Sequence, residues 1–275
     1  MDISNVYAVY FSATGTTQKI VTHIASALGN ELGAKVGTRN FTLPAGRAEP
    51  LVFGKGDCIV FGTPVYAGRI PNVLLTYLET MEGNGALAVP VALFGNRNYD
   101  DALIEQRDLL ERKGFHTVGA AAFVGEHSFS KILAAGRPDS EDMALATRFA
   151  ADVAAKIKAL PEGEALQPVP VKGTPYPHAG YYRPRDGEGI FIDIRKVKSL
   201  VNERCTNCNI CIGLCPLGSI SKENVREYTG ICIKCGACIK GCPENARYYT
   251  DEGYLFHQHD LEAKYTRRAL PELFV

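Results

Sequence analysis

The sequence carries no net charge and no long apolar run, and these absences narrow the functions that it can have. Its 30 Lys and Arg residues balance 30 Asp and Glu residues, with both signs mixed throughout. Nothing therefore predicts a nucleic-acid or anionic-membrane partner. No apolar stretch reaches the length of a membrane span, and residues 1–5 lack the basic and apolar regions that begin a signal peptide. We expect a soluble, cytoplasmic protein.

Several signatures of nucleotide-binding and hydrolytic enzymes are also absent. The chain has no Gly-x-x-x-x-Gly-Lys-Ser/Thr motif, which argues against a nucleoside triphosphatase. No Gly-x-Gly-x-x-Gly motif follows the first predicted strand, so a dinucleotide-binding fold is disfavoured. We find no Ser-His-Asp arrangement and no nucleophile elbow. Cysteine is left as the residue type with the clearest chemical signal.

Eight of the nine cysteines form two copies of one pattern, Cys-x2-Cys-x2-Cys-x3-Cys-Pro. Four cysteine thiolates are the ligands of a [4Fe–4S] cluster, and in this pattern the fourth cysteine of each copy binds the other cluster. The spacing predicts two clusters and hence electron transfer, with the clusters acting as the core of a small domain. The predicted ligands are Cys205, Cys208, Cys211 and Cys242 for the first cluster, and Cys232, Cys235, Cys238 and Cys215 for the second.

Other uses of these cysteines fit the pattern poorly. A disulfide framework needs an oxidising compartment, and paired zinc sites place two cysteines in each knuckle and no Cys-Pro. Eight thiolate ligands favour a reducing cytoplasm, and exposed clusters favour an anaerobic or microaerobic host. The ninth cysteine, Cys58, lies in an apolar run and is expected to be a small buried hydrophobic residue.

The length of 275 residues suits one ordinary domain and one small one. We expect an α/β domain at 1–160, a Pro/Gly-rich connector at 161–189 that packs on a domain surface, a cluster domain at 190–255 and a docked C-terminal tail at 256–275. A helix is expected within 191–203, and His257 and His259 are expected on a surface strand. In the first domain, alternating patterns predict a doubly wound, mostly parallel sheet, with strands at 6–11, 36–42, 58–62, 86–94 and 118–124 and helices at 17–28, 71–81, 100–113 and 140–160.

The first predicted strand runs directly into a hydroxyl-rich loop, Ser12-Ala13-Thr14-Gly15-Thr16-Thr17, after which a helix begins. Four hydroxyl residues and a glycine at a helix N-terminus are typical of an anion site. Plain N-capping is the alternative, but one cap needs only one hydroxyl.

This loop resembles the FMN-phosphate loop of flavodoxins, and the segments 62–71 and 94–101 lie where that family places its flavin contacts. With the cysteine-rich module, nearly the whole chain resembles the flavodoxin–ferredoxin fusion proteins. The resemblance implies a flavodoxin-like five-stranded parallel sheet of order 2-1-3-4-5, followed by a small α+β two-cluster ferredoxin domain. It implies FMN bound through Ser12, Ala13, Thr14, Gly15, Thr16 and Thr17 at the phosphate, and through Thr63, Pro64, Val65, Tyr66, Ala67, Gly68, Gly95, Asn96, Arg97 and Tyr99 at the ring.

The side chains around the ring are only partly specified. Many flavodoxins place a tryptophan against the flavin, and this chain has none, so Tyr66 and Tyr99 are the candidate walls. Arg69 or Arg97 could offset the charge of a reduced flavin or could be solvated rim residues. His127, which follows the fifth predicted strand, is a weak candidate for a catalytic proton donor. A simple turn at 126–128 is the alternative.

FMN exchanges one or two electrons and a cubane exchanges one, so the chain is expected to relay electrons between the clusters and FMN. It would link a low-potential, ferredoxin-like donor to a partner oxidoreductase. The alternative is an FMN-dependent reductase of a small organic or quinone acceptor, with a pocket roofed by residues 176–182. A flavin-free scaffold would require loop 12–17 to be only a helix cap, although three separate loops agree on flavin.

Overall fold

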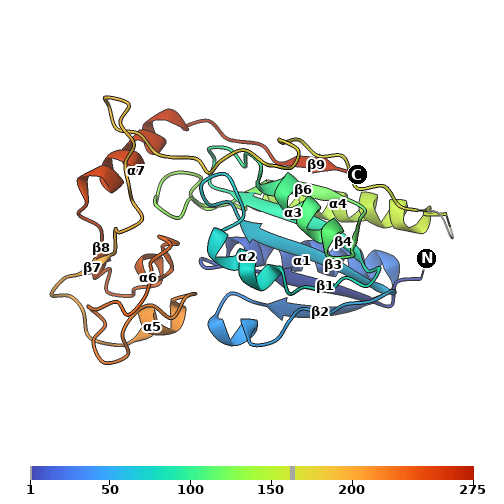
Figure 1. Ribbon diagram of the computed structural model, residues 1–275, viewed down its shortest axis with the longest axis horizontal. Helices are drawn as coiled ribbons and strands as arrows, with labels where there is room; N and C mark the ends of the chain where they lie inside the picture. Colours follow the sequence, from blue (N-terminus) through green and yellow to red (C-terminus); the bar gives the residue numbers. More distant parts are fainter. Residues whose placement is uncertain (1, 162–164) are drawn as a thin grey trace.

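The molecule consists of an α/β half and a cysteine-rich half that lies at one end of the sheet (Figure 1). A computed structural model describes residues 2–161 and 165–275; residue 1 of the predicted first domain and residues 162–164 of the predicted connector lie outside the described residues. The α/β half contains β1 Asn5–Tyr10, α1 Thr16–Leu32, β2 Lys35–Asn40, η1 Pro44–Arg47, β3 Asp57–Pro64, α2 Asn72–Leu78, β4 Leu87–Phe94, α3 Ala102–Arg112, β5 His116–Thr117, β6 Ala120–Val124 and α4 Ser140–Lys158. The rest contains β7 Leu200–Val201, α5 Ile210–Leu214, α6 Ala237–Lys240, β8 Arg247–Tyr248, α7 Glu252–Lys264 and β9 Glu272–Phe274.

The sheet has the order β2-β1-β3-β4-β6-β9, and β5 also pairs with β4. All pairings from β2 to β6 are parallel. Counting β5 and β6 as one interrupted strand gives the expected order 2-1-3-4-5, so the flavodoxin-like sheet is confirmed. Strand β4 is buried at every position, as expected for a parallel sheet that is covered on both faces.

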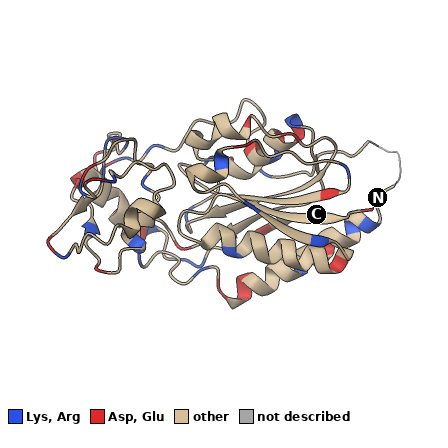
Figure 2. Cartoon of the chain, turned by 90° about the horizontal axis from the view of Figure 1, so that it is seen from below, with Lys and Arg blue, Asp and Glu red and all other residues tan. Residues whose placement is uncertain are grey.

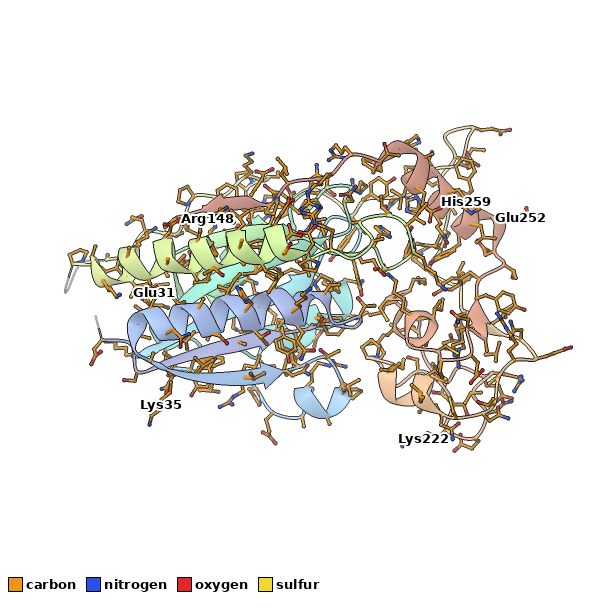
Figure 3. All side chains as sticks on the ribbon, turned by 180° about the vertical axis from the view of Figure 1, so that it is seen from behind. Glu31, Lys35, Arg148, Lys222, Glu252 and His259 are labelled. Carbon is orange, nitrogen blue, oxygen red and sulfur yellow. The ribbon has the colours of Figure 1, made fainter. Side chains whose placement is uncertain are left out.

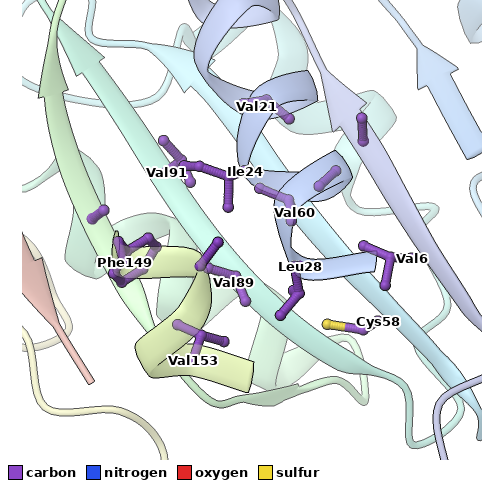
Figure 4. Packing of buried hydrophobic residues seen from close by; sticks show 14 of the residues in the cluster. Val6, Val21, Ile24, Leu28, Cys58, Val60, Val89, Val91, Phe149 and Val153 are labelled. Carbon is purple, nitrogen blue, oxygen red and sulfur yellow. The ribbon is translucent and has the colours of Figure 1, made fainter. Parts of the chain in front are cut away.

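Successive strand residues pack on opposite faces of this sheet. Val60 and Val89 join α1 and α4 in one cluster, whereas Ile59 and Ala88 join α2 and α3 in another. Figure 3 shows α1 and α4 side by side across the first face. Cys58 lies in that cluster with no exposed surface (Figure 4), which confirms its predicted role as a buried hydrophobic residue.

The C-terminal segment returns to the α/β half and adds a strand that the sequence did not predict. Strand β9 pairs antiparallel with β6, with Ala120 opposite Phe274 and Ala122 opposite Glu272. This confirms that the C-terminal tail is docked, and it docks as a strand at the edge of the sheet. The preceding helix α7 carries the chain from the cysteine-rich half to that edge (Figure 1).

Two expectations about secondary structure were wrong. Residues 191–203 form no helix. Instead, Leu200 and Val201 form β7, which pairs antiparallel with β8. The spacing of side chains along the sequence does not indicate this pairing between distant segments. His257 and His259 lie in α7 and not in a strand. That helix is started by Asp251, whose side chain accepts a hydrogen bond from the Tyr254 N–H at 2.8 Å, an N-cap that outweighs the local β pattern.

The cysteine-rich half contains few members of the apolar cores. Apart from Ala269 and the partly buried Ile233, Leu273 and Phe274, every member of the three apolar clusters lies before residue 172. None of the helices in the described part of the chain is long and apolar enough to cross a membrane.

Candidate functional sites

The loop before α1 contains a run of backbone N–H groups that have no partner among the described residues. Gly15 has φ 86° and is the N-cap residue of α1, which it cannot cap because it has no side chain. The Ser12 N–H donates to Thr42 Oγ1 at 2.8 Å, and Ser12 Oγ accepts from the Gln18 N–H at 3.0 Å. Within the described part of the chain, the N–H groups of residues 13–17 donate no hydrogen bond. Free N–H groups at the positive end of a helix fit an anionic group such as a phosphate.

The loop after β3 is a tight turn that contacts the loop after β4. Tyr66 and Arg69 exchange two backbone hydrogen bonds of 3.0 and 3.1 Å, and Ala67 and Gly68 between them have φ values of 52° and 78°. Glycine is required at position 68 because a Cβ there would collide with the Asp100 carboxylate. The Asp101 N–H donates to the Gly68 carbonyl at 3.1 Å. The structure therefore brings the two predicted ring loops together at the carboxyl end of the sheet.

In the loop after β4, two predicted flavin contacts are occupied by the C-terminal segment. Asn96 is buried, and its amide donates to the carbonyls of Tyr265 and Arg267, both at 2.7 Å, and accepts from the Ala269 N–H at 3.1 Å. Tyr99 is 5% exposed, and its hydroxyl donates to Glu272 at 3.0 Å. Stacking of Tyr99 on a flavin stays a prediction. The observed hydrogen bond from Tyr99 to Glu272 holds the C-terminal segment against the loop after β4.

His127 lies directly against the backbone of Gly95, where any Cβ would contact the imidazole ring. Its Nδ1 accepts from the Phe129 N–H at 3.1 Å. Burial, reinforced by the charges of His257, Lys240 and Arg97, lowers the pKa of His127 to about 3. His127 is therefore a neutral ring beside a predicted flavin loop. Its hydrogen bond from the Phe129 N–H also stabilises a turn after β6, which was the alternative to a catalytic role.

The eight cysteines of the two repeats separate into two quartets, each lining its own cavity. Cys205, Cys208, Cys211 and Cys242 line one, which we call the outer quartet. Cys215, Cys232, Cys235 and Cys238 line the other, the inner quartet. The two repeats use the same backbone: left-handed residues at Asn207 and Asn209 in the first match those at Lys234 and Gly236 in the second.

Both quartets fit an iron–sulfur cluster. The N–H of Ser219 points at Cys215 Sγ and that of Ala246 at Cys242 Sγ, both at 3.3 Å, as suits negatively charged sulfur. Burial raises the pKa of the Cys235 thiol to about 12, so a thiolate at this position needs a cationic partner such as iron. The quartets differ in burial: Cys235 and Cys238 are 8% and 9% exposed, whereas Cys208 is exposed.

The inner quartet faces the predicted flavin loops. Burial raises the pKa of Tyr66, and negative charge on Cys235 and Cys232 raises it further. Ile233, between these two cysteines, packs on the apolar cluster of the α/β half.

Polar contacts hold this junction together. Arg47 donates to the Pro216 carbonyl at 2.6 Å, and Lys240 donates to the His127 carbonyl at 2.7 Å and pairs with Glu126. Sequence reasoning missed Arg47 and Lys240, because no local pattern marks a residue that acts across two domains. Charges of both signs are spread over both halves (Figure 2).

A cavity of about 500 Å³ opens beside the ring loops and is lined by residues from four segments. The connector forms one wall of it: the Tyr182 N–H donates to the Ala67 carbonyl at 2.8 Å, and the N–H groups of Ala179 and Thr174 donate to Asp101 at 2.8 and 2.9 Å. Packing of the connector on the domain is confirmed. The lining residues are Ala67, Gly68, Arg69, Asn98, Tyr99, Asp100, Asp101, Lys172, Ala179, Gly180, Tyr182 and Glu272.

Comparison with known proteins identifies both halves. A model described as a flavodoxin domain matches residues 7–95, and one described as a 4Fe-4S dicluster domain matches residues 196–252. Over 47 residues the chain is 40% identical to pyruvate synthase subunit PorD of Methanothermobacter marburgensis, covering 17% of this chain and 57% of that protein. It is 27% identical over 73 residues to NAD(P)H-quinone oxidoreductase subunit I of Gloeobacter violaceus, covering 21% and 35%. The chain thus spans less than two thirds of these relatives.

Solved structures that match include a flavodoxin from the domain Archaea, with 14% identity, a TM-score of 0.41 and coverage of 56% of this chain and 99% of that one. Two-electron reduced Megasphaera elsdenii flavodoxin matches with 18% identity, a TM-score of 0.38 and coverage of 55% and 98%. The family models show a flavodoxin domain at the N-terminal side and a 4Fe-4S dicluster domain at the C-terminal side. The first implies a flavin, the eight cysteines of the second imply two [4Fe–4S] clusters, and the combination suggests electron transfer.

Proposed function

Since the chain joins a flavodoxin domain to a 4Fe-4S dicluster domain, we propose that it is an electron-transfer flavo-iron-sulfur protein. It relays electrons between two [4Fe–4S] clusters and FMN, and links a low-potential donor to a partner oxidoreductase. We assign the outer and inner quartets as cluster ligands and the free N–H groups of residues 13–17 as the FMN-phosphate site. The proposed setting is a reducing cytoplasm, where thiolate ligands persist, in an anaerobic or microaerobic host.

When bound, the clusters supply one-electron transfer and FMN supplies exchange between single electrons and electron pairs. The chain itself supplies binding and orientation. Its loop before α1 offers N–H donors to a phosphate, its turn at Tyr66 and its backbone at Gly95 border the ring site, and neutral His127 can hold a proton at Nε2 because Nδ1 accepts from the Phe129 N–H. We keep the domain limits 1–160, 161–189, 190–255 and 256–275 as part of this proposal.

One observation carries the proposal: Ile233 of the inner quartet's loop packs on the same apolar cluster as Ala13 of the loop before α1, while the outer quartet contains the exposed Cys208. The candidate sites therefore follow one another from the exposed cysteines, through the buried ones, to the flavin loops. Such an order suits a relay in which a partner protein docks at the outer quartet.

Anaerobic purification with iron, sulfide and flavin quantification tests the cofactor content. We expect about eight irons, as two cubanes require, and one FMN per chain, with Cys58→Ala as the control that removes a cysteine without loss of iron. Flavin and clusters should both respond in a stepwise reductive titration followed by absorbance and EPR. Full iron without flavin would overturn the FMN assignment, and flavin without cubane signals would overturn the relay.

A matched pair of substitutions tests the phosphate site. A Cβ at Gly15 meets no atom within 4 Å, and Asn and Asp tolerate its positive φ about equally. Gly15→Asp places a carboxylate beside the free N–H groups and should weaken FMN binding at least tenfold relative to Gly15→Asn. Equal FMN affinity in the two variants would contradict this assignment.

The cavity of about 500 Å³ favours a second candidate function, an FMN-dependent reductase of a small organic or quinone acceptor. It borders Ala67 and Gly68 of a predicted ring loop, and the connector forms one of its walls, as suits a concave substrate pocket. Gly180 lines the cavity, and a Cβ there meets no atom within 4 Å. Gly180→Phe should lower turnover of quinones by the reduced protein without changing electron delivery to a ferredoxin, whereas Gly54→Phe, outside the cavity, should change neither. Unchanged quinone turnover in Gly180→Phe would contradict the reductase.

A further inference from the structure

At one buried position the two cysteine repeats carry side chains of different charge. Ile220 stands five residues after Cys215, and Arg247 stands five residues after Cys242. The preceding residues, Ser219 and Ala246, make equivalent N–H···S contacts, so the backbones correspond. Both side chains are buried, at 2% and 4% exposure. Where the inner-quartet cavity is lined by Ile220, the outer-quartet cavity is lined by a guanidinium.

Arg247 reaches sulfur directly. One of its terminal nitrogens, Nη2, donates to Cys211 Sγ at 3.3 Å and also to the Val225 carbonyl. The other, Nη1, donates to Ser199 Oγ and Tyr228 Oη, both at 3.2 Å. Ser199 Oγ in turn lies 3.8 Å from Cys238 Sγ of the inner quartet. Arg247 therefore sits between the quartets and contacts the outer one.

This guanidinium has no carboxylate partner among the described residues. A buried charge without a counter-charge is costly, so buried arginines are normally paired. Among the groups that Arg247 contacts, the one that can carry negative charge is the sulfur of Cys211, a predicted cluster ligand. Lys234, the other buried cation in the cysteine loops, donates only to the carbonyls of Cys232 and Arg195, at 2.6 and 3.0 Å.

We propose that Arg247 is the internal counter-charge of the outer cluster and raises its reduction potential above the value that an Ile at this position would give. Reduction adds negative charge to the cluster, and a fixed positive charge that donates a hydrogen bond to its sulfur stabilises the reduced state. Arg247 acts through Cys211 and is a positioning and tuning residue. The inference rests on the proposed presence of two clusters.

EPR-monitored redox titration of the anaerobically purified full-length protein tests this inference. Arg247→Gln should shift the reduction equilibrium of one cluster at least tenfold towards the oxidised state. This lowers its midpoint potential by at least 59 mV for one electron. Arg247→Lys keeps the charge but not the planar fork, so it should lower the same midpoint by less. The control is Arg204→Gln, which removes an exposed charge next to Cys205 and should shift neither midpoint.

Iron and sulfide contents separate the possible failures. Wild-type protein without cubane signals would defeat the proposed function, whereas full clusters with unchanged midpoints in Arg247→Gln would defeat this inference alone. An equal shift in Arg204→Gln would also defeat it, because the effect would then be general surface charge. If only Arg247→Lys assembles its clusters, an unchanged midpoint in that variant overturns the inference.

Discussion

Replacing Asp142 by asparagine should destabilise the flavodoxin domain, because it breaks a buried ion pair on which two segments depend. The Arg137 and Asp142 side chains are 5% and 1% exposed, and Arg137 Nη2 donates to Asp142 Oδ1 at 2.5 Å. Arg137 also donates to the Ala269 carbonyl at 3.2 Å, which holds the returning C-terminal segment. The amide that the substitution introduces would keep an oxygen for the Asp139 N–H, which donates to Asp142 Oδ2 at 2.9 Å.

The magnitude follows from the charge that is left behind. Removing one partner of a buried pair typically costs about 3–5 kcal/mol. Asp139 Oδ2 lies 3.7 Å from Arg137 Nε and compensates in part, so we expect the lower end, about 3 kcal/mol, or roughly a hundredfold in the unfolding equilibrium. The double variant Arg137→Met with Asp142→Asn removes both charges and should be more stable than Asp142→Asn alone.

Urea unfolding followed by far-UV circular dichroism and flavin release suits this chain, which contains no tryptophan. The control is Glu141→Gln on the same helical turn, where the side chain is 79% exposed and the expected change is within error. A loss of less than about 1 kcal/mol in Asp142→Asn, or no recovery in the double variant, would refute the reasoning about buried charge.

Three further predictions concern the junction and the clusters. Gly236 has φ 74°, and a Cβ there would lie 2.6 Å from the Ser128 carbonyl oxygen. Gly236→Ala should therefore slow flavin reduction in stopped-flow experiments at full iron content. An unchanged rate would contradict the docking of the inner-quartet loop on the α/β half. Burial first, and the charge of His257 second, lower the pKa of His127 from 6.5 to about 3. Between these pH values the unfolded chain binds a proton that the folded state does not. The free energy of unfolding should therefore fall as the pH drops from 6.5 towards 3. His127→Gln should flatten that pH dependence of the urea midpoint, and an unaltered slope would contradict it. Removing iron with a chelator at neutral pH should unfold the cysteine-rich half, which adds few side chains to the apolar clusters. The far-UV signal of the α/β half should remain, and loss of both signals would show that the halves are one folding unit.

The parts of the molecule that rest on local spacing could be read from the sequence. Apolar runs and helical periods specify the order β1 to α4, since burial on both faces of a sheet and along one face of a helix leaves a short-range pattern. The hydroxyl-rich loop at Gly15 also precedes a helix as expected, because the residues that start a helix are local to its N-terminus. The cysteine repeats predicted two groups of four, because their spacing is that of [4Fe–4S] ligands.

Contacts between distant segments could not be read in that way. Residues 191–203 have helical spacing, yet the pairing of Leu200 with Tyr248 decides their backbone. Asn96 and Tyr99 were expected at a flavin, but their polar atoms are taken by residues 265–272. The cysteine repeat is the exception, since its spacing predicts that Cys215 and Cys242 each join the quartet of the other copy.

The sequence by itself therefore determined the types of the two domains and the cysteine pattern, because backbone geometry and ligand spacing act over a few residues. The tertiary structure alone decided which quartet faces the flavin loops, how β9 closes the sheet edge and where the guanidinium of Arg247 lies. Those features depend on hydrogen bonds and burial between segments far apart along the chain. Such contacts form only when segments that are distant along the chain pack against each other, and they leave no periodic trace in the sequence.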